Sequence, residues 1–245
     1  MRVAVISDVH ANLAAFEAVI ADWGTVDAVW HLGDIVGYGP DPLECIDRLR
    51  SLPSVSIAGN HDWAAIGKID TSTFNPVAAE AVDWTARHLT PDAITYLGEL
   101  PCIIHEGDFT LAHGSPRDPI WEYVLDIQAA RENFAAFTTS VCFIGHSHVP
   151  LAFSAAPGGS SVPVDVRLEP VTYEEVPLGG RRHLINVGSV GQPRDLDPAA
   201  RYLLLDTDRR VYRRRRVEYP IERTQQRMRD VGLPSVLWRR LEFGR

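Results

Sequence analysis

Two hydrophobic periodicities alternate at the start of the chain, and each predicts a different element. Residues 2–7 are a short run rich in Val and Ile, which is typical of a central strand buried on both faces. Residues 13–23 instead place apolar side chains at helical spacing, and Asn12 is positioned to cap the first turn. The chain therefore opens with a strand, a loop and a helix.

The same order of elements then repeats. An apolar strand is predicted at 26–31, and a third strand is predicted at 55–58. Between them Asp41, as a carboxylate cap, Pro42 at the first helical position and Glu44 predict the start of a helix. Parallel strands joined by helices place their carboxyl ends along one edge, where open α/β sheets bind ligands.

Helical and strand patterns continue to the end of the chain. The further predicted helices lie at 76–88, 91–98, 127–137, 221–230 and 234–241. The further predicted strands lie at 102–106, 109–113, 141–144, 151–155, 162–169, 183–188, 201–205 and 211–218. The segment from Pro157 to Ser161 has the composition of a mobile turn and not of a domain linker. We therefore expect a single domain over residues 1–245.

Composition limits the class of protein. A chain of 245 residues with 45% hydrophobic residues can bury a full core. The three cysteines are far apart and lack CxxC spacing, which favours a reduced, intracellular environment. The N-terminal residues lack the apolar region of a signal peptide, and no stretch approaches the roughly eighteen apolar residues of a membrane span. We expect a cytoplasmic protein without membrane contact; its oligomeric state stays open.

The charge pattern bears on the partners. A formal net charge of −8 argues against nucleic acid as a partner and leaves small phosphorylated substrates as candidates. The arginine-rich run 209–216 has the composition of a nucleic-acid patch. Because the run is short and the chain is acidic, a solvated strand explains it better.

Polar residues with metal-binding side chains follow several of the predicted strands. They are Asp8, His10, Asp34, Asn60, His113, His146 and His148. Oxygen and imidazole donors without a thiolate suit Mn, Fe or Zn. Seven ligands are too many for one tetrahedral ion, whereas two divalent ions that share one carboxylate would use them all. We expect Asp34 to be the shared carboxylate.

These residues occur in blocks with a recognisable order. The blocks are Asp8-x-His10, Gly33-Asp34, Gly59-Asn60-His61-Asp62, His113 and Gly145-His146-x-His148. In this order they resemble the calcineurin-like metallophosphoesterase superfamily. The details Gly33-Asp34-Ile-Val-Gly-Tyr-Gly-Pro, His113-Gly-Ser-Pro and Asn186-Val-Gly-Ser-Val-Gly-Gln-Pro-Arg194 are most similar to its small prokaryotic phosphodiesterase branch. The similarity extends from residue 1 to about 205.

The resemblance implies both a fold and a metal centre. The implied fold is α/β (α+β), a four-layer α-β-β-α sandwich of two mixed β-sheets with flanking helices. The implied ligands of one ion are Asp8, His10, Asp34 and His148. The implied ligands of the other are Asp34, Asn60, His113 and His146.

The resemblance also implies an activity. It is a dinuclear metal-dependent phosphoesterase that hydrolyses small phosphodiesters or nucleotides, in which a metal-bridging hydroxide attacks phosphorus. His61, next to Asn60, is the candidate acid for the leaving alkoxide, with a purely supporting role as the alternative. A non-catalytic scaffold on the same fold is a second hypothesis. The complete ligand set speaks against it, because a scaffold has no need of buried carboxylates and imidazoles that repel one another.

One departure from the family narrows the substrate. Ser/Thr protein phosphatases have an Asp and an Arg where this chain has Gly37 and Tyr38. Small phosphodiesters or nucleotides are therefore favoured, with phosphomonoesters or phosphoproteins as alternatives. Substitute phosphate contacts are Arg117 or Arg194, since the guanidinium fork matches phosphate oxygens. Arg194 has the stronger case because it ends a family-like motif, with a surface salt bridge as the alternative. Asn12 is a further candidate that helix capping explains more simply.

Three aromatic residues lie beside the motif loops, namely Trp63, Trp121 and Tyr123. They are candidates for stacking on a nucleobase, although packing in the core or at its rim is the favoured interpretation of each.

Overall fold

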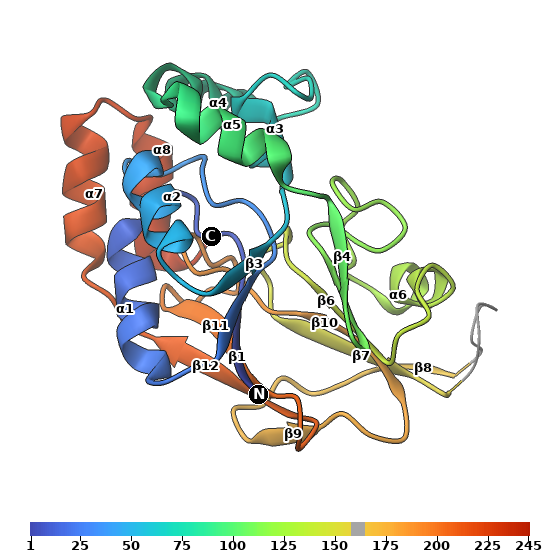
Figure 1. The fold of residues 1–245 in the computed structure, drawn as a ribbon. Helices are drawn as coiled ribbons and strands as arrows, with labels where there is room; N and C mark the ends of the chain where they lie inside the picture. The colour runs from blue at the N-terminus through green and yellow to red at the C-terminus, as the bar shows by residue number, and fades with distance from the viewer. Residues whose placement is uncertain (158–164) are drawn as a thin grey trace.

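Two mixed six-stranded sheets lie face to face in the computed structural model, which describes residues 1–157 and 165–245 (Figure 1). The first sheet has the order β3 (Ser54–Ser56), β2 (Ala28–His31), β1 (Arg2–Ile6), β11 (Ala200–Asp206), β12 (Val211–Val217) and β9 (Glu175–Pro177). The second has the order β4 (Ile103–Glu106), β5 (Phe109–Ala112), β6 (Val141–Ile144), β10 (Arg182–Asn186), β7 (Leu151–Ala155) and β8 (Val166–Leu168).

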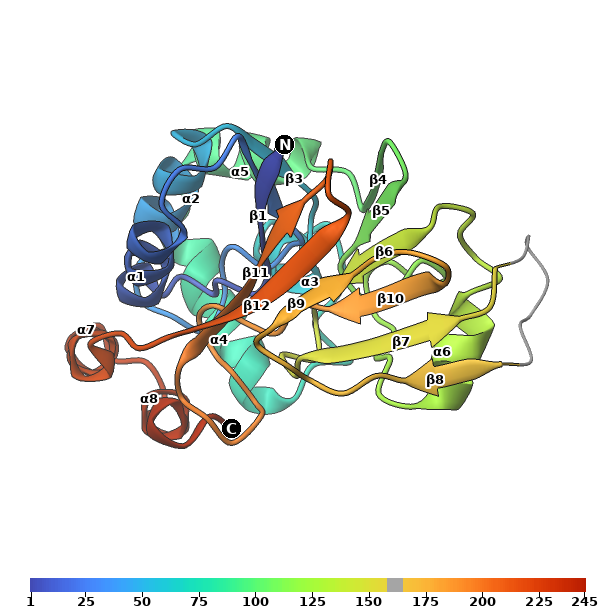
Figure 2. The same cartoon turned by 90° about the horizontal axis from the view of Figure 1, so that it is seen from below.

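Helices cover the outer faces of both sheets (Figures 1 and 2). The first sheet is flanked by α1 (Leu13–Trp23) and α2 (Pro42–Arg50), and the second by α6 (Ile127–Asn133). Helix α7 (Ile221–Asp230) packs on α1. The other helices are α3 (Asn60–Ala65), α4 (Pro76–His88), α5 (Pro91–Glu99), α8 (Ser235–Arg239) and the 3-10 turn η1 (Arg240–Phe243). This arrangement confirms the predicted four-layer sandwich.

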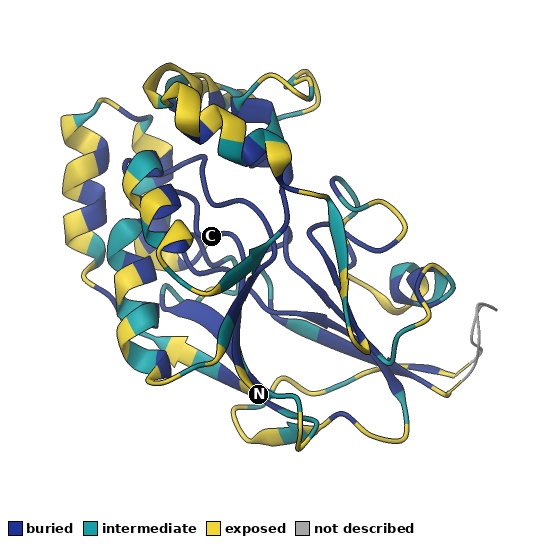
Figure 3. Ribbon diagram, in the orientation of Figure 1, coloured by how far each residue is buried: buried dark blue, intermediate teal, exposed yellow. Residues whose placement is uncertain are grey.

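The alternation of side chains along β1 shows how the layers are held together. Val3 and Val5 pack between the sheets with residues of both, whereas Ala4 and Ile6 pack on the opposite face against Phe16 of α1. Because successive side chains of a strand point to opposite faces, an all-apolar strand can bury both. Figure 3 shows the result, with dark blue strands inside and yellow outer faces on the helices.

Most predicted elements are confirmed, and the differences have local causes. The predicted Asp41 cap is wrong, since the structure shows no side-chain cap bond there and Asp41 Oδ1 accepts hydrogen bonds from Arg227 instead. Two elements, β9 and α3, have no counterpart among the predicted strands and helices. The helix predicted at 127–137 ends at Asn133.

Part of one predicted strand, residues 162–164, and residues 158–161 of the predicted turn lie outside the described residues. Within the described part of the chain, no helix is long and apolar enough to cross a membrane.

Candidate metal centre

The candidate ligands come together where strands of both sheets end. Asp8 and His10 follow β1, Asp34 follows β2, His113 follows β5, His146 and His148 follow β6, and Asn60 is the first residue of α3. Each of the seven is at most 5% exposed. The structure therefore gathers every metal-binding residue that the sequence singled out.

Two groups of side chains in this cluster have the spacing of a metal site. The potential ligand atoms of Asp8, His10 and His148 lie within 4.8 Å of one another, and so do those of Asp34, His113 and His146. The Nε2 atom of His113 is 3.3 Å from Asp34 Oδ2, and that of His10 is 3.6 Å from the same oxygen. Asp34 therefore faces both groups, as the bridging hypothesis requires.

Asn60 extends the second group, because its Oδ1 lies 3.1 Å from Nε2 of His113. A third possible grouping joins His10, Asp34 and His61.

Backbone carbonyls hold the imidazole rings in place. The Nδ1 atoms that lie against carbonyl oxygens are those of His10 on Val36 at 3.1 Å, His113 on Leu32 at 2.8 Å and His148 on Gln192 at 2.6 Å. His146 is reversed, with Nε2 3.2 Å from the carbonyl oxygen of Trp121. Since a carbonyl only accepts, the N–H of each ring points there and the other nitrogen is left for a cation.

The charges of the cluster also fit a cation. The Oδ1 atom of Asp8 is buried and has no hydrogen-bond partner among the described residues. Burial lowers the pKa of His146 to about 3. Burial acts against a charged His113 as well, yet the carboxylate of Asp34 raises its pKa to about 9. A bound divalent cation would replace that proton and satisfy the buried carboxylates.

The backbone of the ligand loops is strained. Five candidate ligands have φ between 49° and 64°, namely Asp8, His10, Asp34, His146 and His148. This left-handed region is uncommon for residues other than glycine, and such strain is concentrated at functional sites. Close packing adds to the constraint, since a Cβ atom on Gly59 would lie 2.1 Å from Asp34 Oδ1.

Asp62 fixes the loop that carries Asp34, a role that sequence reasoning missed. Its carboxylate accepts hydrogen bonds from the backbone N–H groups of Asp34 at 2.7 Å, Val36 at 3.1 Å and Gly59 at 2.9 Å. Burial, with a further contribution from Asp34, raises the pKa of Asp62 to about 7. The Asn60-His61-Asp62 motif was the available signal, but only the fold shows which backbone groups it reaches.

A cavity of about 330 Å³ opens above the candidate ligands. Besides four of them, its lining includes Tyr38, His61, Thr73, Phe74, Asn75, Ala78, Trp121, Tyr123 and Arg194. The guanidinium of Arg194 donates to Gln192 Oε1 at 2.8 Å and lies 3.5 Å from the Tyr38 hydroxyl. Phe74 and Asn75 lie in a loop without a recognisable motif, so no signal in the sequence could have identified them as part of the cavity.

Two predicted substrate contacts lie elsewhere. Asn12 caps α1 through Ala15 N, and its amide donates to the carbonyl of Gly191. Arg117 forms ion pairs with Glu122 and Glu132. Neither belongs to the described residues that line the cavity, so helix capping and ion pairing account for both.

Trp63 is likewise outside the described lining of the cavity, and its ring packs under the Lys68 ammonium group at 3.8 Å.

The basic run does not present a free row of arginines. Arg209 pairs with Glu175, Arg215 with Asp22 and Arg216 with Asp197. Arg214 is buried and donates to two backbone carbonyls, those of Asn186 and Leu151. The prediction of a solvated strand is therefore only partly correct. The run lies largely in β12, but acidic side chains and backbone carbonyls bind several of its arginines.

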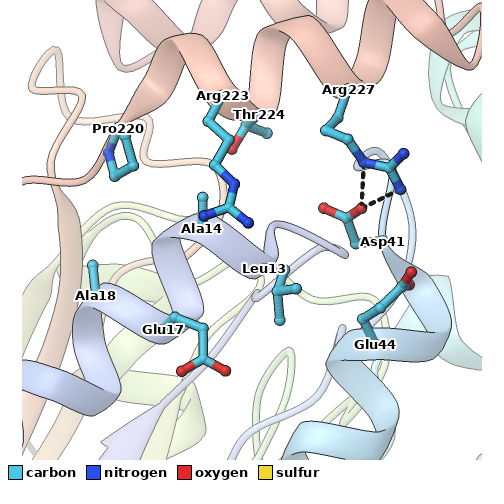
Figure 4. A pocket seen from close by; sticks show the side chains of 10 residues that line it. All are labelled: Leu13, Ala14, Glu17, Ala18, Asp41, Glu44, Pro220, Arg223, Thr224 and Arg227. Atoms are coloured by element: carbon cyan, nitrogen blue, oxygen red, sulfur yellow. Dashed lines mark hydrogen bonds and ion pairs between the residues drawn. The ribbon is translucent and has the colours of Figure 1, made fainter.

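A larger cavity, of about 450 Å³, lies between α1 and α7 (Figure 4). Carboxylates and arginines line it, and Figure 4 shows Arg227 paired with Asp41 across it. Its described lining contains neither histidine nor cysteine. Four of the candidate metal ligands instead line the smaller cavity.

Comparisons with known proteins agree with this geometry. The model of the calcineurin-like phosphoesterase superfamily domain matches residues 1–210. The chain is similar to a metallophosphoesterase of known structure from Sphaerobacter thermophilus, with 48% identity, a TM-score of 0.88 and coverage of 100% of this chain and 99% of that one. An uncharacterized protein from Methanocaldococcus jannaschii is 35% identical over 99% of this chain and 98% of its own length.

A more distant relative has a named activity. The symmetrical bis(5'-nucleosyl)-tetraphosphatase from Aromatoleum aromaticum is 29% identical over 161 residues, which are 60% of this chain and 56% of that protein.

Proposed function

Because the chain belongs to the calcineurin-like phosphoesterase superfamily and is a hydrolase of phosphoester bonds, we propose that its substrates are small phosphodiesters or nucleotides, cleaved above Asp34. The observation that carries the proposal is the position of this carboxylate. It faces two groups of imidazole and oxygen donors at the floor of a 330 Å³ cavity. A cavity of that volume suits a small substrate.

We assign the seven buried donors to two divalent ions, either Mn, Fe or Zn. One ion would be held by Asp8, His10 and His148 and the other by Asn60, His113 and His146, with Asp34 available to both. When bound, the ions supply positive charge that attracts phosphate oxygens and lowers the pKa of water. The chain contributes the fixed geometry, because carbonyl contacts or strained loops hold six of the seven candidate ligands, all but Asn60, in place before substrate binds.

His61 is positioned to move a proton. Its ring lines the cavity, its backbone N–H donates to Asp34 Oδ1 at 2.8 Å, and its Nδ1 has no hydrogen-bond partner among the described residues. Burial lowers the pKa of His61 to about 4. The negative charge of a phosphoester in the cavity opposes this effect, so substrate binding favours the protonated ring that can donate to the leaving oxygen.

Arg194 is our candidate for the phosphate contact. It lines the cavity, and its bond to Gln192 orients the guanidinium. A planar guanidinium can donate two parallel hydrogen bonds to phosphate oxygens.

The backbone around residue 37 separates this site from that of a protein phosphatase. Gly37 has φ of 91°, and a Cβ atom there would lie 2.5 Å from His61 Nδ1. An aspartate, as protein phosphatases have at this position, therefore has no room while His61 keeps its place. The ring of Tyr38 lies 4.4 Å from that of His61, where it narrows the cavity. Both features favour a small substrate over a phosphoprotein.

The relative named as a bis(5'-nucleosyl)-tetraphosphatase supports a nucleotide as one such substrate. The test is hydrolysis of bis-p-nitrophenyl phosphate and of p-nitrophenyl phosphate in Mn, Fe or Zn, with Asp34→Asn as the inactive control. We expect metal-dependent cleavage with preference for the diester. A preference for the monoester would identify a phosphomonoesterase. Inactivity with every metal and with nucleotides would identify a scaffold and overturn the proposal.

A further inference from the structure

Three aromatic side chains, which we call the aromatic rim, border the cavity above the candidate metal centre. Phe74 and Trp121 are half-buried, and Tyr123 is 49% exposed. Phe74 lies just before α4, whereas Trp121 and Tyr123 lie between β5 and α6. The ring centroids of Phe74 and Trp121 are 5.5 Å apart with an interplanar angle of 83°, so two distant loops meet edge to face beside the cavity.

The aromatic rim contacts two histidines of the candidate site. The Phe74 ring centroid lies 5.0 Å from that of His61, and the Tyr123 ring stacks on His146 with centroids 4.1 Å apart and an interplanar angle of 20°. A phosphoester bound above Asp34 would therefore place its neighbouring substituent against these rings.

Polar side chains next to the aromatic rim can form hydrogen bonds with the edge of a bound ring. Thr73 and Asn75 line the same cavity, and Asn75 Oδ1 accepts from Ala78 N at 2.9 Å. Because that oxygen caps α4, the amide N–H groups of Asn75 are the donors it offers to a ligand. A wall of aromatic faces with a few hydrogen-bonding groups is typical of a site for a flat, polar heterocycle.

We propose that the aromatic rim binds a heteroaromatic ring of the substrate, of the nucleobase kind, next to the phosphate that is cleaved. The proposal rests on the proposed function, since the phosphate must lie above Asp34 for the ring to reach Phe74 and Trp121. Stacking of a base on aromatic side chains strengthens binding on the order of tenfold or more. Specificity would then depend on the ring and not only on the phosphate.

The test compares two ligands that differ only by the base, adenosine 5′-monophosphate and ribose 5-phosphate. Calorimetric titration of the Mn-loaded protein measures binding, and an assay for released inorganic phosphate checks that neither monoester is hydrolysed during the titration. We expect the nucleotide to bind on the order of tenfold more tightly. In Trp121→Leu and Phe74→Leu, which keep an apolar side chain but remove the ring, the ratio of the two affinities should fall toward one while the affinity for ribose 5-phosphate is kept. Trp84→Leu is the matched control, because Trp84 stacks on His88 in α4 and lies outside the cavity lining.

Equal affinities of the two ligands in the wild-type protein would overturn the inference, as would a ratio that survives both rim substitutions. Hydrolysis of methyl p-nitrophenyl phosphate is measured separately. Turnover of this ester together with equal affinities would refute the ring site alone. A clear preference for the nucleotide in a protein that hydrolyses nothing would support the ring site and refute the proposed function.

Discussion

The Nε2 atoms of His10 and His148 lie 3.1 Å apart, although the Nδ1 atom of each ring is already held by a backbone carbonyl. With the ring proton on Nδ1, the two Nε2 lone pairs face each other. Burial lowers the pKa of both imidazoles, so further protonation is disfavoured. A cation between the rings would convert this repulsion into two bonds.

We therefore expect removal of metal to destabilise the fold. At a free ion concentration of 100 times Kd, binding stabilises the folded state by about 2.7 kcal/mol per site, or roughly 5–10 °C in Tm for a chain of this size. Thermal unfolding followed by circular dichroism, after chelation and after re-addition of Mn or Zn, checks this. Calcium is the control ion, because it prefers an all-oxygen site. Equal Tm values with and without Mn or Zn would contradict the metal assignment.

The shared carboxylate gives a prediction about stoichiometry. Asp34→Asn removes a charge that faces both groups of ligands, so metal content should fall at both sites. His146→Ala removes a ligand from one group only and should retain one ion. Elemental analysis after gel filtration distinguishes the two variants. Two full sites in Asp34→Asn would refute the bridging role.

His61 should matter for the leaving group and not for metal retention. We expect His61→Ala to keep both ions and to hydrolyse bis-p-nitrophenyl phosphate well, because nitrophenolate leaves without a proton. With an alkoxide leaving group the rate should fall about 10²- to 10⁴-fold, the usual contribution of a general acid. Loss of metal in this variant would show that His61 has a ligand role instead.

The parts of this site that could be predicted are those that depend only on residues close together in the sequence. Asp8, His10, Asp34 and the other ligands follow strands, and strand ends on one edge of a sheet meet whatever the surrounding residues are. The two-sheet sandwich was implied by the family resemblance, which rests on the order of the motifs, and not by the apolar runs alone.

Contacts made through the tertiary fold could not be predicted in this way. Asn12 and Asp41 looked alike as helix caps, but only Asn12 caps, because Arg227 of α7 engages Asp41 from 186 positions away. Phe74 became part of the cavity only where its loop meets Trp121. The sequence already favoured Arg194 over Arg117 because of the motif that ends at Arg194, and the acidic partners of Arg117, Glu122 and Glu132, separate the two arginines in the structure.

This distinction can be measured. Arg194→Lys replaces a guanidinium fork with a point charge, so we expect KM to rise about tenfold while the metal content stays the same. Arg117→Lys is the matched control, and it should leave KM unchanged because its ion pairs lie outside the cavity. Steady-state kinetics on one diester checks both variants. An unchanged KM in Arg194→Lys would remove Arg194 from the substrate site.

Asp197 connects the basic run 209–216 to a buried arginine of the neighbouring strand. Its carboxylate accepts hydrogen bonds from Arg216 and from Arg201, whose side chain is only 5% exposed. Burial raises the pKa of Asp197, but these two guanidinium groups outweigh it and hold the pKa well below the usual range. The unfolded chain therefore takes up this proton at a higher pH than the folded protein does. The resulting stabilisation is complete above the unfolded pKa of about 4 and disappears as the pH falls through the folded value.

Asp197→Asn should accordingly lower the free energy of unfolding at pH 7, on the order of 2 kcal/mol for hydrogen bonds to a charged group. Urea unfolding of both proteins between pH 7 and pH 3 measures the difference. We expect it to be constant down to about pH 5 and to shrink below pH 4, because the Asp197 carboxylate of the unfolded wild-type chain then takes up its proton while that of the folded protein is still ionised. Asp208→Asn is the control, because its ion pair with the Met1 amino group is exposed and screened by solvent. A difference that persists unchanged at pH 3 would mean that Asp197 stabilises the fold through packing and not through its charge.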